Sequence, residues 1–295
     1  MKTNILAGIL SLAALTLNAQ SRTASPEIIK TRAFFETLGQ HYAADKSVTM
    51  NKETIKGVDC YWFGTGREKT DDIIVYLHGG AFVLGGIRSH AAMVSHFAKN
   101  FDKKILFVDY ALAPEHPFPA APNEVLAVYK ALLQSHPKSK IIFAGDSAGA
   151  ALAVTAIHSV IAEKLKMPGA AILISPWINL QCNTNSYKTR QALDPVLTKD
   201  MLYHNAVLYA GGNLKAADPN EMTFKEFPPV FILVGTNEVL HDDATTFHDY
   251  ISTVQKKATL KEYKDQVHVW PLGDISSAKS EEAMRDIEAF LKEIL

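Results

Sequence analysis

The fold of this chain is decided by the stretch Ile141-Ile142-Phe143-Ala144-Gly145-Asp146-Ser147-Ala148-Gly149. The apolar run that opens it is typical of a buried strand, and the sequence from Ala148 to Leu165 is typical of a helix. A Gly-x-Ser-x-Gly pattern between a strand and a helix is a nucleophile elbow, a sharp turn that presents the serine at the strand end. We expect Gly145 and Gly149 to be required because strand and helix approach too closely there for a β-carbon.

A second motif, His78-Gly79-Gly80-Ala81, follows the apolar run Ile73–Leu77 and changes how Ser147 is interpreted. Alone, the elbow pattern also fits a small residue in a tight glycine-rich turn. The second motif adds glycine amides that, with the amide after the serine, can bind the oxyanion of a tetrahedral intermediate. Together the motifs predict acyl transfer through Ser147, with His78 as a support for the loop rather than a reacting group.

A serine nucleophile needs a base and an acid, which follow an elbow in the chain order serine, acid, histidine. The predicted strand Val230–Val234 is followed by Glu238, and then by Asp242 and Asp243 where the next helix starts. The two aspartates are explained as N-terminal caps that complement the helix dipole, so Glu238 is favoured as the acid and Asp242 is the alternative. His268 is the predicted base, because it is the histidine in the loop after the last strand.

Composition sets the size and class of the protein. The 295 residues are 47% hydrophobic, which is enough for one large core, and the formal net charge is −1. The lack of a basic excess argues against a nucleic-acid partner. Short apolar strands alternate with helices, which predicts a mostly parallel central sheet flanked by helices, an α/β fold.

The predicted strands are Val58–Phe63, Ile73–Leu77, Ile105–Tyr110, Ile141–Ala144, Ala171–Ser175, Val230–Val234 and Leu260–Tyr263. The predicted helices are Pro26–Ala44, Ser89–Asn100, Pro122–Ser135, Ala148–Leu165, Asp243–Lys256 and Ser280–Leu295. The long interval Pro176–Phe227 interrupts this alternation with polar turns around a helical stretch, Lys199–Tyr209. Such an insertion above the strand ends predicts a lid.

The N-terminus has the layout of a secretory signal peptide. Lys2 precedes an apolar stretch from Ile5 to Leu17, and a small residue, Ala19, ends the segment. We predict that residues 1–19 are a signal peptide, that 20–295 form a single domain, and that the protein is exported to the periplasm or secreted. The alternative is a buried N-terminal helix. The stretch is too short for a stable transmembrane helix, so no stable membrane anchor is expected.

Cysteine and histidine usage gives no sign of a metal. The two cysteines, Cys60 and Cys182, either pair in an oxidising compartment or are separate buried thiols. The 11 histidines form no His-Glu-x-x-His pattern, and no Cys-x-x-Cys is present. We expect neither a metal nor an organic cofactor. A homodimer formed through an edge strand or the cap is an open alternative.

With these motifs the chain resembles the hormone-sensitive-lipase-like family of α/β hydrolases. The resemblance covers roughly residues 45–295 and is carried by His78–Ala81, Asp109–Ala120, Gly145–Gly149, Ser186–Pro195, Pro228–Asp243 and Val267–Trp270. It implies an α/β-hydrolase fold with a helical cap, built from the N-terminal segment (about 24–46) and the insertion (about 177–227). It also implies hydrolysis of small carboxylic esters, usually with short acyl chains, and the predicted export is the reason to expect acetyl-like groups.

The resemblance implies a Ser147–His268–Glu238 triad and an oxyanion hole formed by the amides of Gly79, Gly80 and Ala148. Two departures stand out. Ala81 occupies a position where the family often has a third glycine, and Glu238-Val239 stands where an aspartate followed by proline is common. The acid therefore rests on the branch of bacterial esterases that carries glutamate. Another serine hydrolase, such as an amidase, an arylformamidase or a peptidase, and a catalytically silent binding protein are the competing functions.

Overall fold

The structure, a computed structural model, describes residues 22–295. The predicted signal peptide, residues 1–19, lies outside these described residues. Eight strands form one sheet in the order β1-β2-β4-β3-β5-β6-β7-β8. The pairs β1–β2 and β2–β4 are antiparallel, and the other neighbouring strands run parallel. The strands are β1 (Thr49–Ile55), β2 (Val58–Gly64), β3 (Ile73–Leu77), β4 (Lys104–Val108), β5 (Ile141–Asp146), β6 (Ala170–Ile174), β7 (Val230–Gly235) and β8 (Ala258–Tyr263).

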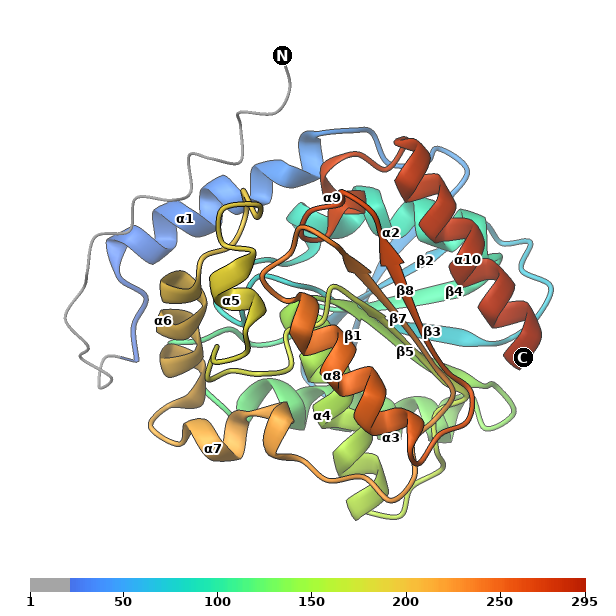
Figure 1. Ribbon diagram of the computed structural model, residues 1–295. Helices are drawn as coiled ribbons and strands as arrows, with labels where there is room; N and C mark the ends of the chain where they lie inside the picture. The colour runs from blue at the N-terminus through green and yellow to red at the C-terminus, as the bar shows by residue number, and fades with distance from the viewer. Residues whose placement is uncertain (1–21) are drawn as a thin grey trace.

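Helices cover both faces of this sheet, as predicted, and the α/β-hydrolase fold is confirmed (Figure 1). Side chains at alternate positions of β3 enter different cores. Ile73, Val75 and Leu77 pack with α3, α4 and α8, whereas Ile74 and Tyr76 pack with α2 and α10. Burial on both faces explains why the central strands are continuous apolar runs. The covering helices are α2 (Ile87–Phe101), α3 (Ala120–Ser135), α4 (Ala148–Ala162), α8 (His241–Ser252), α9 (Trp270–Gly273) and α10 (Ala278–Ile294).

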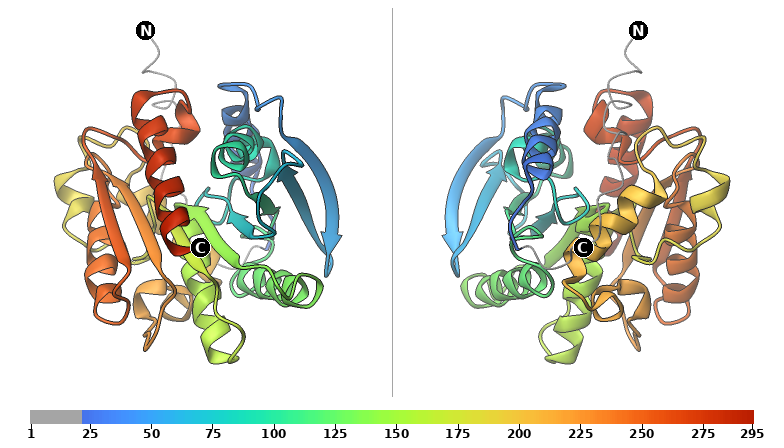
Figure 2. Two further views of the ribbon diagram at one scale, coloured as in Figure 1. Left: turned by 90° about the vertical axis from the view of Figure 1, so that its right-hand side faces the viewer. Right: turned by 90° about the vertical axis from the view of Figure 1, so that its left-hand side faces the viewer.

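One strand was not predicted from the sequence. β1 forms a hairpin with β2 at one edge of the sheet, with β8 at the other edge (Figure 2). Six of its seven residues are exposed, so it has no apolar alternation that a sequence pattern detects. The two-residue turn Lys56-Gly57 has positive φ at both positions, 54° and 86°, which suits the twist of a hairpin.

The predicted cap is present in two parts. The N-terminal part is α1 (Pro26–Glu36) with the 3₁₀ turn η2 (Thr37–Gln40), and the insertion holds α5 (Ser186–Thr189), α6 (Lys199–Ala210), α7 (Leu214–Ala217) and the 3₁₀ turn η3 (Pro219–Glu221) (Figure 1). The first helix ends earlier than predicted. Beyond it the chain passes so close to α2 that a β-carbon at Gly39 would clash with the carbonyl of Arg88.

Arg32 joins the N-terminal part of the cap to the rest of the domain. Its guanidinium donates to the carbonyls of Val83 and Ala113, each at 2.8 Å, and pairs with Glu115 at 2.6 Å. Val83 and Ala113 follow the C-terminal ends of β3 and β4, so this part of the cap lies at the end of the sheet where parallel strands carry functional loops. Within residues 22–295, no helix has the length and apolar character needed to cross a membrane.

Candidate active site

Ser147 lies in a strained turn between β5 and α4. Its φ and ψ are 53° and −121°, a conformation that costs a non-glycine residue on the order of 1–3 kcal/mol. The glycine prediction is confirmed, since a β-carbon at Gly149 would clash with the carbonyl of Leu77. At Gly145 it would lie 2.6 Å from the carbonyl of Gly149. The amide of Ser147 donates to the carbonyl of Ile174 at 2.9 Å, which ties the turn to β6.

The loop after β3 runs directly against this serine. A β-carbon at Gly79 would lie 3.1 Å from the Cβ of Ser147 and would clash with the carboxylate of Asp146. Gly80 has a φ of 119°, and a β-carbon there would clash with the carbonyl of Leu84. Among the described residues, the amides of Gly79, Gly80 and Ala148 donate to no protein acceptor. Unpaired N–H donors beside a serine fit the predicted oxyanion hole.

Ala81, which occupies the place of the family's third glycine, is also in the left-handed region, with a φ of 54°. The next residue, Phe82, has a φ of 62°. The loop tolerates two such residues because it is tied down on both sides of them. Leu84 donates to the carbonyl of Gly80 at 2.8 Å, and Ala113 donates to the carbonyl of Phe82 at 2.9 Å.

His78 supports this loop, as the sequence suggested. Its side chain is fully buried, and its Nδ1 lies 2.7 Å from the carbonyl oxygen of Gly79. A carbonyl oxygen only accepts, so Nδ1 carries the proton. Burial lowers the pKa of His78 to about 3, which keeps the ring neutral. The ring stacks on Tyr110 at 4.2 Å, and the Tyr110 hydroxyl donates to the carbonyl of His78 at 2.6 Å.

Glu238 and His268 are brought together by the loops after β7 and β8. His268 Nδ1 donates to Glu238 Oε2 at 2.9 Å, which leaves Nε2 with the lone pair of a base. The second oxygen, Glu238 Oε1, accepts from Gly235 N at 2.6 Å and from Ser175 Oγ at 2.7 Å. Glu238 is completely buried, so the carboxylate depends on these three donors.

The environment of His268 favours its charged form. Burial by itself lowers the pKa of this imidazole, but the hydrogen bond to Glu238 and the negative charges of Glu238, Asp194 and Asp146 raise it above its ordinary value. A histidine stabilised in this way is suited to accept a proton from a serine hydroxyl.

Ser147 and His268 are not hydrogen-bonded to each other. Within residues 22–295, neither Ser147 Oγ nor His268 Nε2 takes part in a hydrogen bond. The two are linked through β6. Ile174 of β6 accepts from the amide of Ser147. The next residue, Ser175, donates to Glu238 and accepts from Val269 N at 3.2 Å. In structures without a bound substrate, hydrogen bonds between reacting side chains are often long.

The alternative acid, Asp242, has a different partner. Its Oδ2 accepts from Ser186 N at 2.8 Å, and its Oδ1 lies 3.3 Å from His241. The N-cap position of α8 is Leu240, so the prediction that Asp242 and Asp243 cap this helix is wrong, although their place in its first turn agrees with the predicted effect on the helix dipole. They lie in its first turn, but neither makes a capping hydrogen bond. The insertion passes beside this turn, and its backbone amides donate hydrogen bonds to both side chains.

Asp243 shows this most clearly. It is buried and accepts from Ile178 N at 3.0 Å, from Asn179 N at 2.8 Å and from the Tyr187 hydroxyl at 3.2 Å. Burial raises the pKa of Asp243 to about 8. This carboxyl group therefore fastens the insertion to α8 rather than capping the helix.

Two residues of the site were not singled out in the sequence. Ser175 stands directly after β6, with a positive φ of 48°, and its hydroxyl joins the loops of Glu238 and His268. Asp194, in the insertion, accepts from Val239 N at 2.9 Å. A polar residue at the end of an apolar strand was the available signal for Ser175. Asp194 lies within the Ser186–Pro195 segment that carries the resemblance, but no local pattern indicates its role, because its partner lies 45 residues away.

The two cysteines form no disulfide. Cys60 and Cys182 are both free and buried, so the pairing alternative is wrong. Burial raises the pKa of each thiol to about 12, which makes both poor nucleophiles. In the described part of the chain, no cluster of three or more histidine, cysteine, aspartate or glutamate side chains could hold a metal ion.

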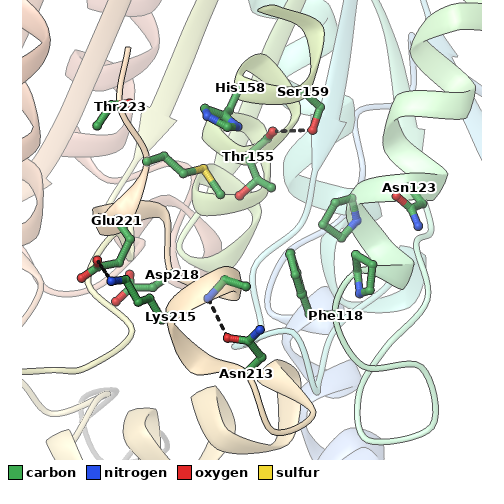
Figure 3. A pocket seen from close by; sticks show the side chains of 14 residues that line it. Phe118, Asn123, Thr155, His158, Ser159, Asn213, Lys215, Asp218, Glu221 and Thr223 are labelled. Atoms are coloured by element: carbon green, nitrogen blue, oxygen red, sulfur yellow. Dashed lines mark hydrogen bonds and ion pairs between the residues drawn. The ribbon is translucent and has the colours of Figure 1, made fainter. Parts of the chain in front are cut away.

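A hollow of about 580 Å³ lies away from this chemistry, between α3, α4 and α7 (Figure 3). Ser147, Glu238 and His268 are not among the residues that line it. Several of its polar side chains are engaged in the fold. Asn213 accepts from Ala216 N at 3.2 Å, Lys215 pairs with Glu221 at 3.9 Å, and Thr155 donates to the carbonyl of Ala151 at 3.1 Å.

Comparison with known proteins agrees with this geometry. The profile of the α/β-hydrolase fold family matches residues 74–272. The chain belongs to this family. An acetyl-hydrolase from Streptomyces hygroscopicus is 36% identical over 201 residues, which cover 67% of each chain. An esterase from Acinetobacter venetianus is 31% identical over 223 residues, which cover 74% of each chain.

Solved structures extend the likeness to nearly the whole hydrolase. A crystal structure of an esterase from the bacterial hormone-sensitive lipase family superposes with a TM-score of 0.88. The two are 29% identical, and the match covers 98% of this chain and 96% of the other. The resemblance to that family is confirmed, and with it the prediction of a carboxylic ester hydrolase at the level of the family.

Proposed function

We propose that this hydrolase is a serine esterase for short, acetyl-like acyl groups, which works through Ser147, His268 and Glu238. The proposal is carried by one observation, the pairing of a buried Glu238 with His268 Nδ1 at 2.9 Å in the loops beyond β7 and β8. The pairing fixes the imidazole tautomer in which Nε2 is free to act as a base. No cofactor is needed for this chemistry.

The reaction has two halves. His268 Nε2 takes the Ser147 hydroxyl proton while Oγ bonds to the ester carbonyl carbon, and the carbonyl electrons move onto the oxygen. The amides of Gly79, Gly80 and Ala148 stabilise that oxyanion. The bond to the alcohol oxygen then breaks, and His268 gives its proton to the leaving alcohol. In the second half water loses a proton to His268, attacks the acyl carbon and releases the acid, and Ser147 regains its proton.

Two observations support a short acyl group. The Streptomyces relative is an acetyl-hydrolase. In this chain three buried aromatic rings also pack beside the oxyanion loop: Phe82 stacks on Tyr209 with ring centroids 3.7 Å apart, and Trp177 lies 5.8 Å from Phe82. Trp177 N also donates to the carbonyl of Ser147 at 3.2 Å, which brings this group to the nucleophile. Rings packed in this way leave little room for a long chain.

Hydrolysis of 4-nitrophenyl esters of increasing acyl length tests this directly. We expect kcat/KM to be greatest for acetate to butyrate and to fall by about tenfold or more for acyl chains of eight carbons and longer, because added methylenes must displace packed rings. Matched anilides separate an esterase from an amidase. An optimum at long chains, or anilides cleaved faster than esters, would contradict the proposal.

The pH dependence of kcat/KM tests the role of His268. The imidazole must be neutral to accept a proton, and Glu238 raises its pKa above the ordinary 6.5. We therefore expect kcat/KM for 4-nitrophenyl acetate to rise with pH along one acid limb whose midpoint lies above 6.5. An acid limb with its midpoint well below that value would show that the base lacks this carboxylate partner.

Export is a separate proposal that rests on the sequence of residues 1–19. Cleavage after Ala19 leaves Gln20 as the first residue. Intact-mass measurement of the protein from the periplasm or medium tests this. Recovery of a chain that starts at Met1 and stays in the cytoplasm would overturn it.

A further inference from the structure

We infer that Asp194 is a positioning residue of the active site, which fixes the peptide after Glu238 and places a second carboxylate near His268. The inference rests on the proposed triad. Asp194 lies in the cap insertion, between α5 and α6, and only 5% of its surface is exposed to solvent.

The two oxygens of Asp194 serve different parts of the fold. Oδ1 accepts from Val196 N at 2.9 Å and from Leu197 N at 3.0 Å, so it shapes the cap loop around itself. Oδ2 crosses to the acid loop and accepts from Val239 N at 2.9 Å. That N–H belongs to the peptide bond between Glu238 and Val239, so the carboxylate holds the backbone of the acid from the cap side.

A second cap residue holds the other side of Val239. The Ser186 hydroxyl donates to the Val239 carbonyl at 2.6 Å. The insertion thus forms hydrogen bonds with both peptide groups of Val239, the residue after Glu238. The hydrogen bond to Asp194 requires an N–H at position 239, which a proline there would lack. The role of Asp194 therefore depends on a residue other than proline at this position.

The charge of Asp194 also reaches the base. Three carboxyl groups act on the His268 imidazole: Glu238 from the loop after β7, Asp194 from the insertion, and Asp146 from the elbow. The pKa of Asp194 lies above its ordinary value, mainly because the group is buried. The charge of His268 and the backbone donors lower this pKa, and the charge of Glu238 raises it. An ionised Asp194 therefore adds to the effect of Glu238, and its loss lowers the pKa of His268.

Asp218 provides a matched control for this carboxylate. It is also a buried aspartate of the insertion, and it accepts hydrogen bonds from two backbone amides, Leu180 N and Asn220 N, each at 3.1 Å, where Asp194 accepts from three. Burial raises its pKa as well, but its charged neighbour is Glu221 rather than His268. Asp218→Asn therefore reproduces the structural cost of the change without its effect on the base.

The experiment compares pH profiles of kcat/KM for 4-nitrophenyl acetate in four proteins: the unchanged protein, Asp194→Asn, Asp218→Asn and Glu238→Gln. For Asp194→Asn we expect the acid limb to move to lower pH and the plateau to fall by about tenfold, with kcat affected more than KM. The acid limb of Asp218→Asn is expected to coincide with that of the unchanged protein.

Asp194→Glu adds a second measurement, because it keeps the charge and alters the reach of the carboxylate. We expect its acid limb to lie near that of the unchanged protein while its plateau falls. An acid limb in Asp194→Asn that matches Asp218→Asn would overturn the inference. If Glu238→Gln retains full activity, the triad itself is wrong, so the two failures are distinguishable. The low-field NMR signal of the His268 Nδ1 proton reports the same environment if Asp194→Asn proves too inactive to assay.

Discussion

Replacing Ser147 with alanine is expected to lower kcat for 4-nitrophenyl acetate by about five to six orders of magnitude. The variant keeps the amides of the oxyanion loop and the His268–Glu238 pair, but it has no oxygen to form the acyl-enzyme. Alanine at this position meets the same positive φ as serine, so the melting temperature should change by no more than a few degrees. Steady-state kinetics and thermal unfolding of the same preparation measure both.

A serine on the same helix provides the control. Ser159, in α4, donates to the carbonyl of Thr155 at 3.1 Å and lines the hollow, which none of Ser147, Glu238 and His268 lines. Ser159→Ala is expected to keep nearly full activity. A fluorophosphonate probe should label the unchanged protein and Ser159→Ala at Ser147, and leave Ser147→Ala unlabelled. Activity in Ser147→Ala above about one-hundredth of that of the unchanged protein would refute the assignment.

The sequence was sufficient to predict the strands that are buried on both faces of the sheet. β3 was predicted with its exact bounds, because an uninterrupted apolar run this short, with turn residues on both sides, is typical of a strand buried on both faces. β1 was missed for the opposite reason, because its polar side chains bury no face. The end of the first helix was also misjudged. It depends on the close passage of Gly39 along α2, a tertiary contact with no local signal.

The site divides in the same way. Chain order and loop position after predicted strands were enough to select Glu238 and His268, which the structure brings within 2.9 Å of each other. The residues that hold these two in place could not be predicted from the sequence. Ser175 acts through its hydroxyl and Asp194 through the amide of Val239, and in both cases the partners lie in distant segments of the chain. The first-turn aspartates of α8 show the limit of local rules. Their place in the first turn agrees with the helix dipole, but their hydrogen bonds come from amides of the insertion rather than from the N-terminus of the helix.

Replacing Glu238 with glutamine is expected to lower kcat by about three to four orders of magnitude, although the two side chains have nearly the same shape. Glu238 accepts three hydrogen bonds, from Gly235 N, Ser175 Oγ and His268 Nδ1. A glutamine amide has one oxygen, and its NH₂ group cannot accept the Nδ1 proton. The imidazole is then forced to carry its proton on Nε2, where it cannot take the proton of Ser147. Single-turnover kinetics of acyl-enzyme formation measure the step that fails.

Asp242→Asn makes the comparison decisive, because it applies the same change to the alternative acid four positions along the chain. Its carboxylate accepts from Ser186 N, a bond that the oxygen of asparagine can preserve, so we expect activity within about tenfold of that of the unchanged protein. If Asp242 were the acid, Asp242→Asn would lose most of the activity and Glu238→Gln would keep it. The pH profile separates the outcomes further: removing the charge of Glu238 takes away the first of the contacts that raise the pKa of His268, so any residual activity of Glu238→Gln should have its acid limb at lower pH. Residual activity with an unmoved acid limb would mean that the imidazole is oriented and charged by some other group.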